Sequence, residues 1–345
     1  MSALDIPRKT RVMEGVAPDA IPYAQLMQAQ EPVILKGVAR DWPLVQHGLK
    51  SPDAAMEYIA RYYQGRPIVE YRCAPEEGGR YFYTDAVDGF NFERGRVPLD
   101  DFFAHIREAA AERNGASAYV GSTDLGIFFP GLRDENDLVL NDPMFDAHAP
   151  LVSIWMGNHT IASAHYDMSH NLACCMVGKR TFTLFPPDQV ANLYPGPLEP
   201  TPGGQVVSMV DFRSPDLDRY PRFRDAMAAG QVAELEPGDV LFYPALWWHN
   251  VEGFGDFTAM INYWWNTSPG FMDTPQNTLL HAMLSLRDRP DPEKQAWKAL
   301  FDYYIFGSPD RPAEHLPDAA QGNLAPMDEL RARRLRAMLL NKLNR

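Results

Sequence analysis

Cysteine is scarce in this chain, which has only Cys73, Cys174 and Cys175 among its 345 residues. Two of the three are adjacent, which is poor geometry for an ordinary disulfide, and an odd number leaves one thiol over. No Cys-x-x-Cys pair occurs. These features exclude a disulfide framework and a thiolate zinc site, and they predict reduced thiols in a cytoplasmic protein.

Long apolar runs are missing as well. No run of 18 apolar residues occurs, and residues 1–10 lack the apolar segment of a secretion signal. The sequence therefore predicts a soluble chain that has no membrane partner.

Positive charge is in deficit, since 32 lysines and arginines face 45 aspartates and glutamates, giving a net charge of -13. An acidic protein repels phosphate backbones, which disfavours a nucleic-acid partner. The one basic cluster, at residues 331–336, is interpreted as the solvated face of a helix.

Apolar and aromatic residues, at 46% and 12% of the chain, suffice for a packed core. The first third has a mixed α and β pattern. The β-branched run at 32–37 predicts a strand, as does the run at 118–121. Ser51 followed by Pro52 predicts the start of a helix, and a second helix is expected from Pro98.

Residues 150–268 consist of short apolar runs separated by glycine, proline, asparagine and aspartate. The runs cover 151–156, 172–177, 181–185, 206–210, 232–235, 240–243 and 258–265. Several short strands at such spacing indicate an all-β barrel or a double-sheet jelly roll. We expect a mainly β catalytic domain at 1–275, with a barrel core at about 118–268, and N-terminal α/β elements.

The remaining residues, 276–345, form a helical region by their apolar spacing, and the final helix is expected at about 327–343. These helices have no evident core of their own. They either cover the barrel or pair with a second copy of the chain, and a homodimer through the C-terminal helices is the interpretation favoured here.

The most informative segment is His165-Tyr166-Asp167. In a strand, residues i and i+2 point to the same side, so an imidazole and a carboxylate project together. A further imidazole would complete the two-histidine, one-carboxylate set that binds non-haem iron. His249, which follows an aromatic strand, is the best candidate. The motif His-x-Asp alone is common by chance, but its combination with apolar strands and the distal histidine favours a metal site. The neighbouring His159 and His170 are interpreted as loop histidines.

A dicarboxylate such as 2-oxoglutarate, chelating that metal, needs a cation deep in the barrel for its far carboxylate. The segment 178–185 offers Lys179 and Arg180. Alternation places Arg180 with the inward apolar residues, and its planar guanidinium can grip a carboxylate through two hydrogen bonds. Hydroxyls for the same carboxylate are available from Tyr119 and from Ser163 or Thr160. Polar residues within apolar strands should also have partners inside the barrel, and they are Asn171 and Asn262.

Taken together, the span from about 31 to 266 resembles the cupin-like branch of the JmjC superfamily, which includes an asparaginyl hydroxylase. The matching motifs are 165–167, Asn171, Leu184-Phe185-Pro186-Pro187-Asp188, Trp247-Trp248-His249 and Ile261-Asn262-Tyr263-Trp264. The resemblance implies a double-stranded β-helix core, Fe(II), 2-oxoglutarate and O₂. It assigns the metal to His165, Asp167 and His249, and it places Tyr119, Arg180, Asn171 and Asn262 around the co-substrate.

Two features depart from the family pattern. Arg180 stands where the family usually has lysine, and the threonine that often precedes the first metal ligand aligns only with a shift, so that Ser163 or Thr160 must replace it.

The activity implied is hydroxylation of a C–H bond in a protein side chain or a small molecule, with release of succinate and CO₂. The alternatives are a metal-binding cupin without 2-oxoglutarate chemistry (an isomerase or dioxygenase) and a non-catalytic barrel scaffold.

Overall fold

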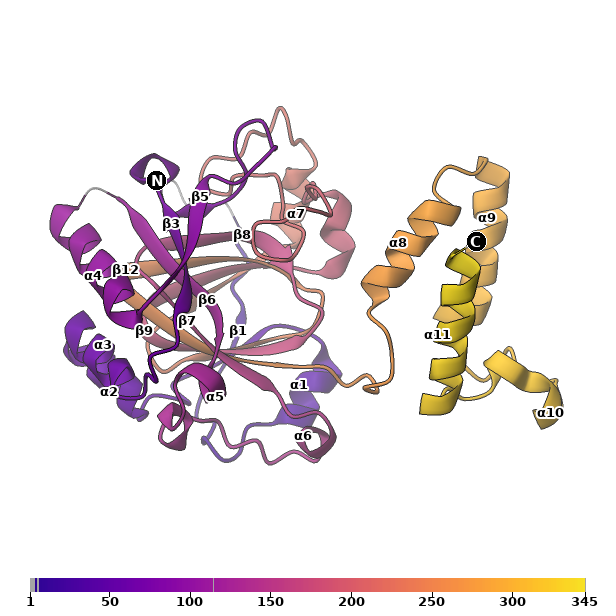
Figure 1. The fold of residues 1–345 in the computed structure, drawn as a ribbon, viewed down its shortest axis with the longest axis horizontal. Coiled ribbons are helices and arrows are strands. Elements are labelled where there is room, and N and C mark those ends of the chain that lie inside the picture. The colour runs from indigo at the N-terminus through magenta and orange to yellow at the C-terminus, as the bar shows by residue number, and fades with distance from the viewer. Residues whose placement is uncertain (1–3, 5, 114, 345) are drawn as a thin grey trace. The chain divides into compact units, whose positions relative to one another are not determined.

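The structure is a computed structural model that describes residues 4, 6–113 and 115–344 (Figure 1). Its contacts divide the chain into two units, Met1–Asn266 and Thr267–Arg345. The first unit contains all twelve strands of the described residues, which form one continuous hydrogen-bonded sheet.

The strands differ greatly in length, and the two longest cross the whole barrel. Their bounds are β1 Arg11–Met13, β2 Val33–Leu35, β3 Ile68–Cys73, β4 Arg80–Tyr81, β5 Phe92–Val97, β6 Ser117–Asp124, β7 Leu151–Gly157, β8 Thr160–Tyr166, β9 His170–Phe185, β10 Gln231–Leu235, β11 Val240–Tyr243 and β12 Trp248–Trp265.

Strands β9 and β12 connect two layers of the sheet. The first half of β9 pairs with β11 and with the second half of β12, which continues through β7, β6 and β3 to β5. The second half of β9 pairs with β10 and with the first half of β12, which continues through β8 to β4. This arrangement confirms the predicted fold class, a jelly-roll core with flanking helices.

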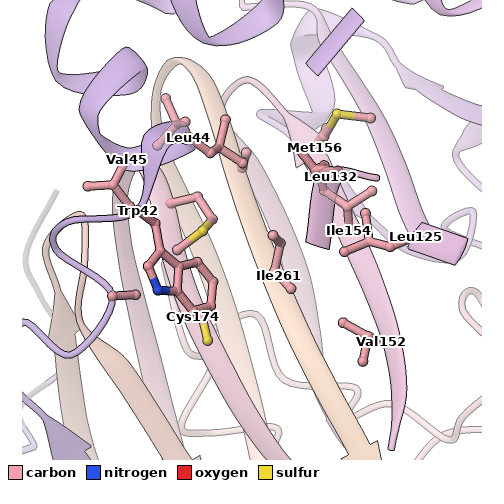
Figure 2. Packing of buried hydrophobic residues seen from close by; sticks show 14 of the residues in the cluster. Trp42, Leu44, Val45, Leu125, Leu132, Val152, Ile154, Met156, Cys174 and Ile261 are labelled. Atoms are coloured by element: carbon pink, nitrogen blue, oxygen red, sulfur yellow. The ribbon is translucent and has the colours of Figure 1, made fainter. Parts of the chain in front are cut away.

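Short helices flank the sheet of the first unit. Their bounds are α1 Tyr23–Ala29, α2 Pro43–Lys50, α3 Pro52–Ala60, α4 Leu99–Glu112, α5 Leu125–Phe128, α6 Met144–Ala147 and α7 Phe223–Ala229, with 3₁₀ turns at Pro75–Glu77, Leu132–Asp134 and Pro187–Ala191. Helices α2, α3 and α4 lie on the outer face of β9 and β12. Figure 2 shows Trp42, Leu44 and Val45 packed over Cys174 and Ile261 of these strands.

The start of α3 follows from its sequence. The Ser51 hydroxyl accepts a hydrogen bond from the Ala54 amide at 3.1 Å, and Pro52 occupies the first helical position. A side-chain cap and a proline without an N–H both suit the first turn, where backbone donors have no helical partner. The helix expected after Ser51 is confirmed.

The apolar runs 172–177 and 181–185 belong to the single strand β9, which bends at Gly178 with a φ of 71°. The prediction of a strand at 206–210 is wrong. That segment forms only isolated bridges, from Val207 to His165 and from Ser208 to Pro195. Val206 and Val210 are buried instead in a cluster with Phe185 and Phe223, whereas Val207 is buried against Phe82 and Tyr83.

The second unit is helical, with α8 Pro275–Ser285, α9 Asp291–Phe301, α10 Asp318–Gln321 and α11 Glu329–Leu343, a π-turn at Asp302–Phe306 and a 3₁₀ turn at Gly322–Leu324. The final helix therefore lies where the sequence predicts it. Many large apolar side chains of this unit are exposed, among them Leu284 (79%) and Phe306 (76%). Within the described part of the chain, no helix combines the length and apolarity that crossing a bilayer requires.

Candidate active site

His165 and His249 are brought together by strand pairing. They are direct cross-strand partners of β8 and β12, and their ring centroids are 4.3 Å apart. Asp167 follows β8, and one carboxylate oxygen lies 3.5 Å from Nε2 of His249. One ligand atom from each of the three side chains lies within 4.8 Å of the others. The set that the sequence suggested thus converges on one point.

Backbone carbonyls fix the orientation of both imidazoles. Nδ1 of His165 lies 2.8 Å from the carbonyl oxygen of Ser163, and Nδ1 of His249 lies 2.9 Å from that of Trp247. A carbonyl only accepts, so each Nδ1 carries the proton and each Nε2 keeps a free lone pair. A nearby carbonyl that holds a ligating imidazole in one tautomer is typical of metal sites.

The electrostatics suit a cation. Burial and the neighbouring His249 lower the pKa of His165 to about 4, which keeps its imidazole neutral. Burial alone would raise the pKa of Asp167, but the neighbouring imidazoles of His249 and His165 lower it below its usual range. Two neutral nitrogens and one carboxylate are the donors expected of a facial iron site.

The turn before His249 is held against the backbone of Asp167. Leu246 adopts a left-handed backbone conformation with φ of 66°, and its amide donates to the backbone carbonyl of Asp167 at 2.8 Å. A non-glycine residue in this region is strained. The strain is compensated by a contact that fixes two ligand-bearing segments to each other.

A β-bulge in β8 decides which side chains share the interior with the three ligands. His165 pairs with His249, whereas Ala162 pairs with Val251, so two residues of β8 oppose Asn250 alone. The extra residue reverses the alternation. Thr160, five positions before His165, therefore lies on the same side as the histidine, where an unbroken strand would place it on the other.

The narrow inner chamber, of about 40 Å³, extends from the ligands towards Arg180. The Arg180 side chain is buried, only 3% of the residue being exposed. Among the described residues, its side chain forms one hydrogen bond, a weak one of 3.4 Å to the Thr258 hydroxyl, and its Nε has no partner. Within the described residues, no carboxylate forms an ion pair with it.

Other polar residues suggested by the sequence also lie in the inner chamber. Its lining includes Tyr119, Thr160, Asn171 and Asn262. The amide of Asn171 donates to the Tyr243 hydroxyl at 2.6 Å, which leaves its Oδ1 buried without a partner. Burial raises the pKa of Tyr119, so its hydroxyl remains a hydrogen-bond donor. The chamber thus presents several polar groups that have spare capacity to bind a ligand.

Two predicted residues lie elsewhere. Lys179 points to solvent and pairs with Glu236 at 2.8 Å, because successive residues of β9 face opposite sides; it does not reach the chamber. Ser163 is absent from the inner lining and borders the wider outer space, where its hydroxyl accepts a hydrogen bond from Arg80 at 3.2 Å. The bulge separates Ser163 from Thr160.

Sequence reasoning missed three residues. Tyr243 lies with its ring centroid 4.7 Å from that of His249, and Trp155 donates from its indole to Asn262 at 2.6 Å. Thr258 contacts Arg180 from β12. Trp155 and Tyr243 occupy aromatic positions of predicted strands, but only the paired layers show which side each ring takes.

A wider outer chamber, of about 480 Å³, adjoins the inner one at His165 and Asp167. Both are bordered by His165, Asp167, Tyr119 and Trp155. A group in the outer chamber would therefore reach His165 and Asp167, whereas Arg180 and His249 border only the inner chamber.

Comparison with known proteins agrees with this geometry. Residues 18–271 match the family described as a cupin-like domain, which is most of the chain. The chain belongs to the cupin-like domain family. The resemblance to JmjC-type proteins inferred from its motifs is confirmed.

Curated proteins with several different names are similar to this cupin-like protein. It is 28% identical over 202 residues to lysine-specific demethylase JMJ31 of Arabidopsis thaliana, which covers 51% of the chain and 36% of that relative. It is 36% identical over 255 residues to HSPB1-associated protein 1 of Rattus norvegicus (69% and 49%). It is 34% identical over 218 residues to tRNA wybutosine-synthesizing protein 5 of Mus musculus (62% and 59%). In each case the chain spans less than two thirds of the relative.

Proposed function

We propose that this cupin-like protein is an Fe(II)- and 2-oxoglutarate-dependent oxygenase that hydroxylates a C–H bond of a protein side chain or a small molecule. The observation that carries the proposal is Arg180, a buried cation with no carboxylate partner among the described residues, in the same narrow chamber as His165, Asp167 and His249. Burying an unpaired ion costs several kcal/mol. An anionic ligand that enters the chamber offsets this cost.

The donor set fits iron. Nε2 of His165, Nε2 of His249 and a carboxylate oxygen of Asp167 would hold it, and three protein ligands leave positions open. When bound, Fe(II) with 2-oxoglutarate and O₂ supplies the oxidising chemistry, with succinate and CO₂ as products. The protein itself positions the ligands, keeps the His165 imidazole neutral and limits access of water through the narrow chamber.

The co-substrate fits the chamber by charge. Arg180 would hold the far carboxylate through its guanidinium, with hydroxyls from Thr160 and Tyr119 beside it. Asn171 and Asn262 would contact the part nearer the metal. The distribution of one cation at the end of the chamber and three metal ligands at its entrance matches a molecule with a carboxylate at each end.

The outcome of the hydroxylation depends on the substrate. Hydroxylation of an N-methyl group leads to loss of formaldehyde, which is demethylation. Hydroxylation of a carbon that is not attached to nitrogen gives a stable alcohol. The names of the relatives include a lysine-specific demethylase. For this chain we favour the stable alcohol, because the described lining of the outer chamber offers no carboxylate besides Asp167 to pair with a methylated ammonium group.

The first experiment measures 2-oxoglutarate binding by calorimetry, without O₂, to full-length protein loaded with Mn(II). We expect binding only with the metal present, because the ligand chelates it and pairs with Arg180. Fe(II)-loaded protein exposed to O₂ should then form succinate slowly without any primary substrate. Absence of binding to metal-loaded protein would contradict the proposal and favour a metal-binding cupin without 2-oxoglutarate or a scaffold.

We further propose that the second unit mediates a homodimer. Exposed apolar side chains recur along its helices, including Leu284, Phe306 and Leu340. Such a surface is costly in water and is reduced by self-association. Light scattering of the full chain should give twice the chain mass of 38.9 kDa. The variant Leu284→Asp should weaken the dimer, while Gln276→Glu on the same helix should not; a monomeric wild-type chain would contradict the proposal.

A further inference from the structure

We propose that the outer chamber admits an uncharged group with an aromatic or aliphatic face and rejects a lysine or arginine side chain. The inference rests on the proposed function and adds to it a substrate class. It starts from the lining, in which Asp167 is, among the residues that the structure describes, the only one of the Asp, Glu, Lys and Arg types. That carboxylate is already committed to the metal site.

Aromatic rings form a continuous wall of the outer chamber. From Phe92 the wall runs to Tyr81 at a centroid distance of 5.6 Å, and from there to Tyr119 at 5.3 Å. The centroids of Tyr119 and Trp155 are 6.2 Å apart, and those of Trp155 and Trp264 are 5.6 Å apart. Rings at these separations offer faces and edges on which another flat or aliphatic group packs well.

The structure also makes room beside this wall. In β6, Val120 pairs with Met156 and Thr123 pairs with Ile154, so two residues oppose Trp155. One of them is Gly121, where a Cβ would lie 3.3 Å from the indole ring of Trp155. A side chain at this bulge position would crowd the rings of Trp155 and Tyr119, and the glycine avoids this crowding where both rings border the chamber.

The polar groups of the wall are neutral. The hydroxyl of Ser122 donates to Ser153, and that of Thr123 donates to the carbonyl of Gly121. Gln205, from the segment between β9 and β10, adds an amide. These groups can orient a polar edge of a substrate, but none can neutralise an ammonium or guanidinium ion.

A comparison of two free energies argues against the binding of a cation in the outer chamber. Aromatic faces attract a cation by roughly 0.5–2 kcal/mol. Removing an ammonium from water without a counter-ion costs several kcal/mol. In the loaded site the charges of the metal and Arg180 are balanced by Asp167 and the two carboxylates of the co-substrate, so no net negative charge remains to compensate a substrate cation.

An uncharged side chain of an otherwise polar peptide satisfies these conditions. A nucleic-acid source of the flat group is disfavoured by the net charge of -13. The chemistry thus separates this chain from the substrate that the name of its lysine-specific demethylase relative indicates.

The test uses the full-length protein with Mn(II) and 2-oxoglutarate and without O₂, so that no turnover occurs. The probes are N-acetyl-L-tryptophanamide, which is neutral, and N-acetyl-N6,N6-dimethyl-L-lysinamide, which is a cation. We expect the neutral probe to bind about tenfold more tightly, a difference of about 1.4 kcal/mol. A single-stranded oligonucleotide is the third arm, and we expect it not to bind.

Two variants locate the binding. Gly121→Val fills the space beside Trp155 and should abolish binding of the neutral probe while 2-oxoglutarate still binds. Gln205→Glu adds a carboxylate of nearly the same shape and should shift the preference at least threefold towards the cation. The second variant keeps the test decisive if the first does not fold.

Three results would overturn the inference: equal or tighter binding of the cationic probe or of the oligonucleotide by the wild type, no binding of either probe, or no change in preference in Gln205→Glu. Failure of 2-oxoglutarate to bind metal-loaded protein is a separate result. It would remove the proposed function itself, and with it this inference.

Discussion

Replacing Asp167 by alanine should abolish succinate formation and weaken Fe(II) binding about a hundredfold or more. Changes to groups that only support metal ligands already cost 10–100-fold. Asp167 supplies the only carboxylate of the three-residue set, and its anionic charge partly neutralises the metal. Its removal leaves two neutral imidazoles, which bind a hard divalent ion less tightly. The measurements are metal titration under anaerobic conditions and succinate formation after exposure to O₂.

The matched control is Asp256→Ala. Asp256 lies on β12, the strand that carries His249, but it is exposed. This variant should keep the metal affinity and turnover of the wild type, which separates loss of a ligand from a general loss of negative charge. Succinate formation by Asp167→Ala at more than a few per cent of the wild-type rate would contradict the assignment.

Replacing Arg180 by methionine should change two quantities in opposite directions. The dissociation constant of 2-oxoglutarate should rise about a hundredfold, since a charge-assisted pair of hydrogen bonds contributes about 3 kcal/mol. The free energy of unfolding of the ligand-free protein should rise by about 1–4 kcal/mol, because a buried ion without a partner is exchanged for an apolar side chain of similar length. A group that serves only the fold would not show this opposition.

Lys179→Met is the control for this pair of effects. Lys179 is the adjacent residue on β9, and it points to solvent beside Glu236. Its replacement should leave both the binding of 2-oxoglutarate and that of the metal unchanged. If Lys179→Met weakened binding of 2-oxoglutarate and Arg180→Met did not, the inward face of β9 would be assigned wrongly. Metal affinity should be unchanged in both variants, which distinguishes a co-substrate contact from damage to the metal site.

There is a general physical reason why Arg180→Met should weaken the binding of 2-oxoglutarate and yet stabilise the ligand-free protein. A side chain that binds an anion must remain unsatisfied until the anion arrives, so the empty protein is less stable than its packing alone would allow. The buried, unpaired Oδ1 of Asn171 in the same chamber fits this view.

Local patterns in the sequence were sufficient for much of the molecule. Alternation along a strand predicted that His165 and Asp167 project together and that Arg180 faces inward while Lys179 does not. Ser51 and Pro52 predicted the start of α3, because capping depends on neighbouring residues only. Short apolar runs predicted the barrel. The strand wrongly predicted at 206–210 is apolar because Val206 and Val210 are buried beside Phe185 and Val207 is buried beside Phe82. Burial alone does not require strand pairing.

The tertiary structure decided what depends on pairing between distant segments. His249 meets His165 because β8 and β12 pair in one register, and a shift by one residue would turn each side chain to the other face. The bulge in β8 brings Thr160 to the side of the ligands, and the bulge in β6 places Gly121 opposite Trp155, where a side chain would crowd the indole. Register and bulges are set by the packing of whole layers, which no local pattern records. The sequence by itself therefore determined which residues have the chemistry, and the paired layers determined how they meet and what kind of group can reach them.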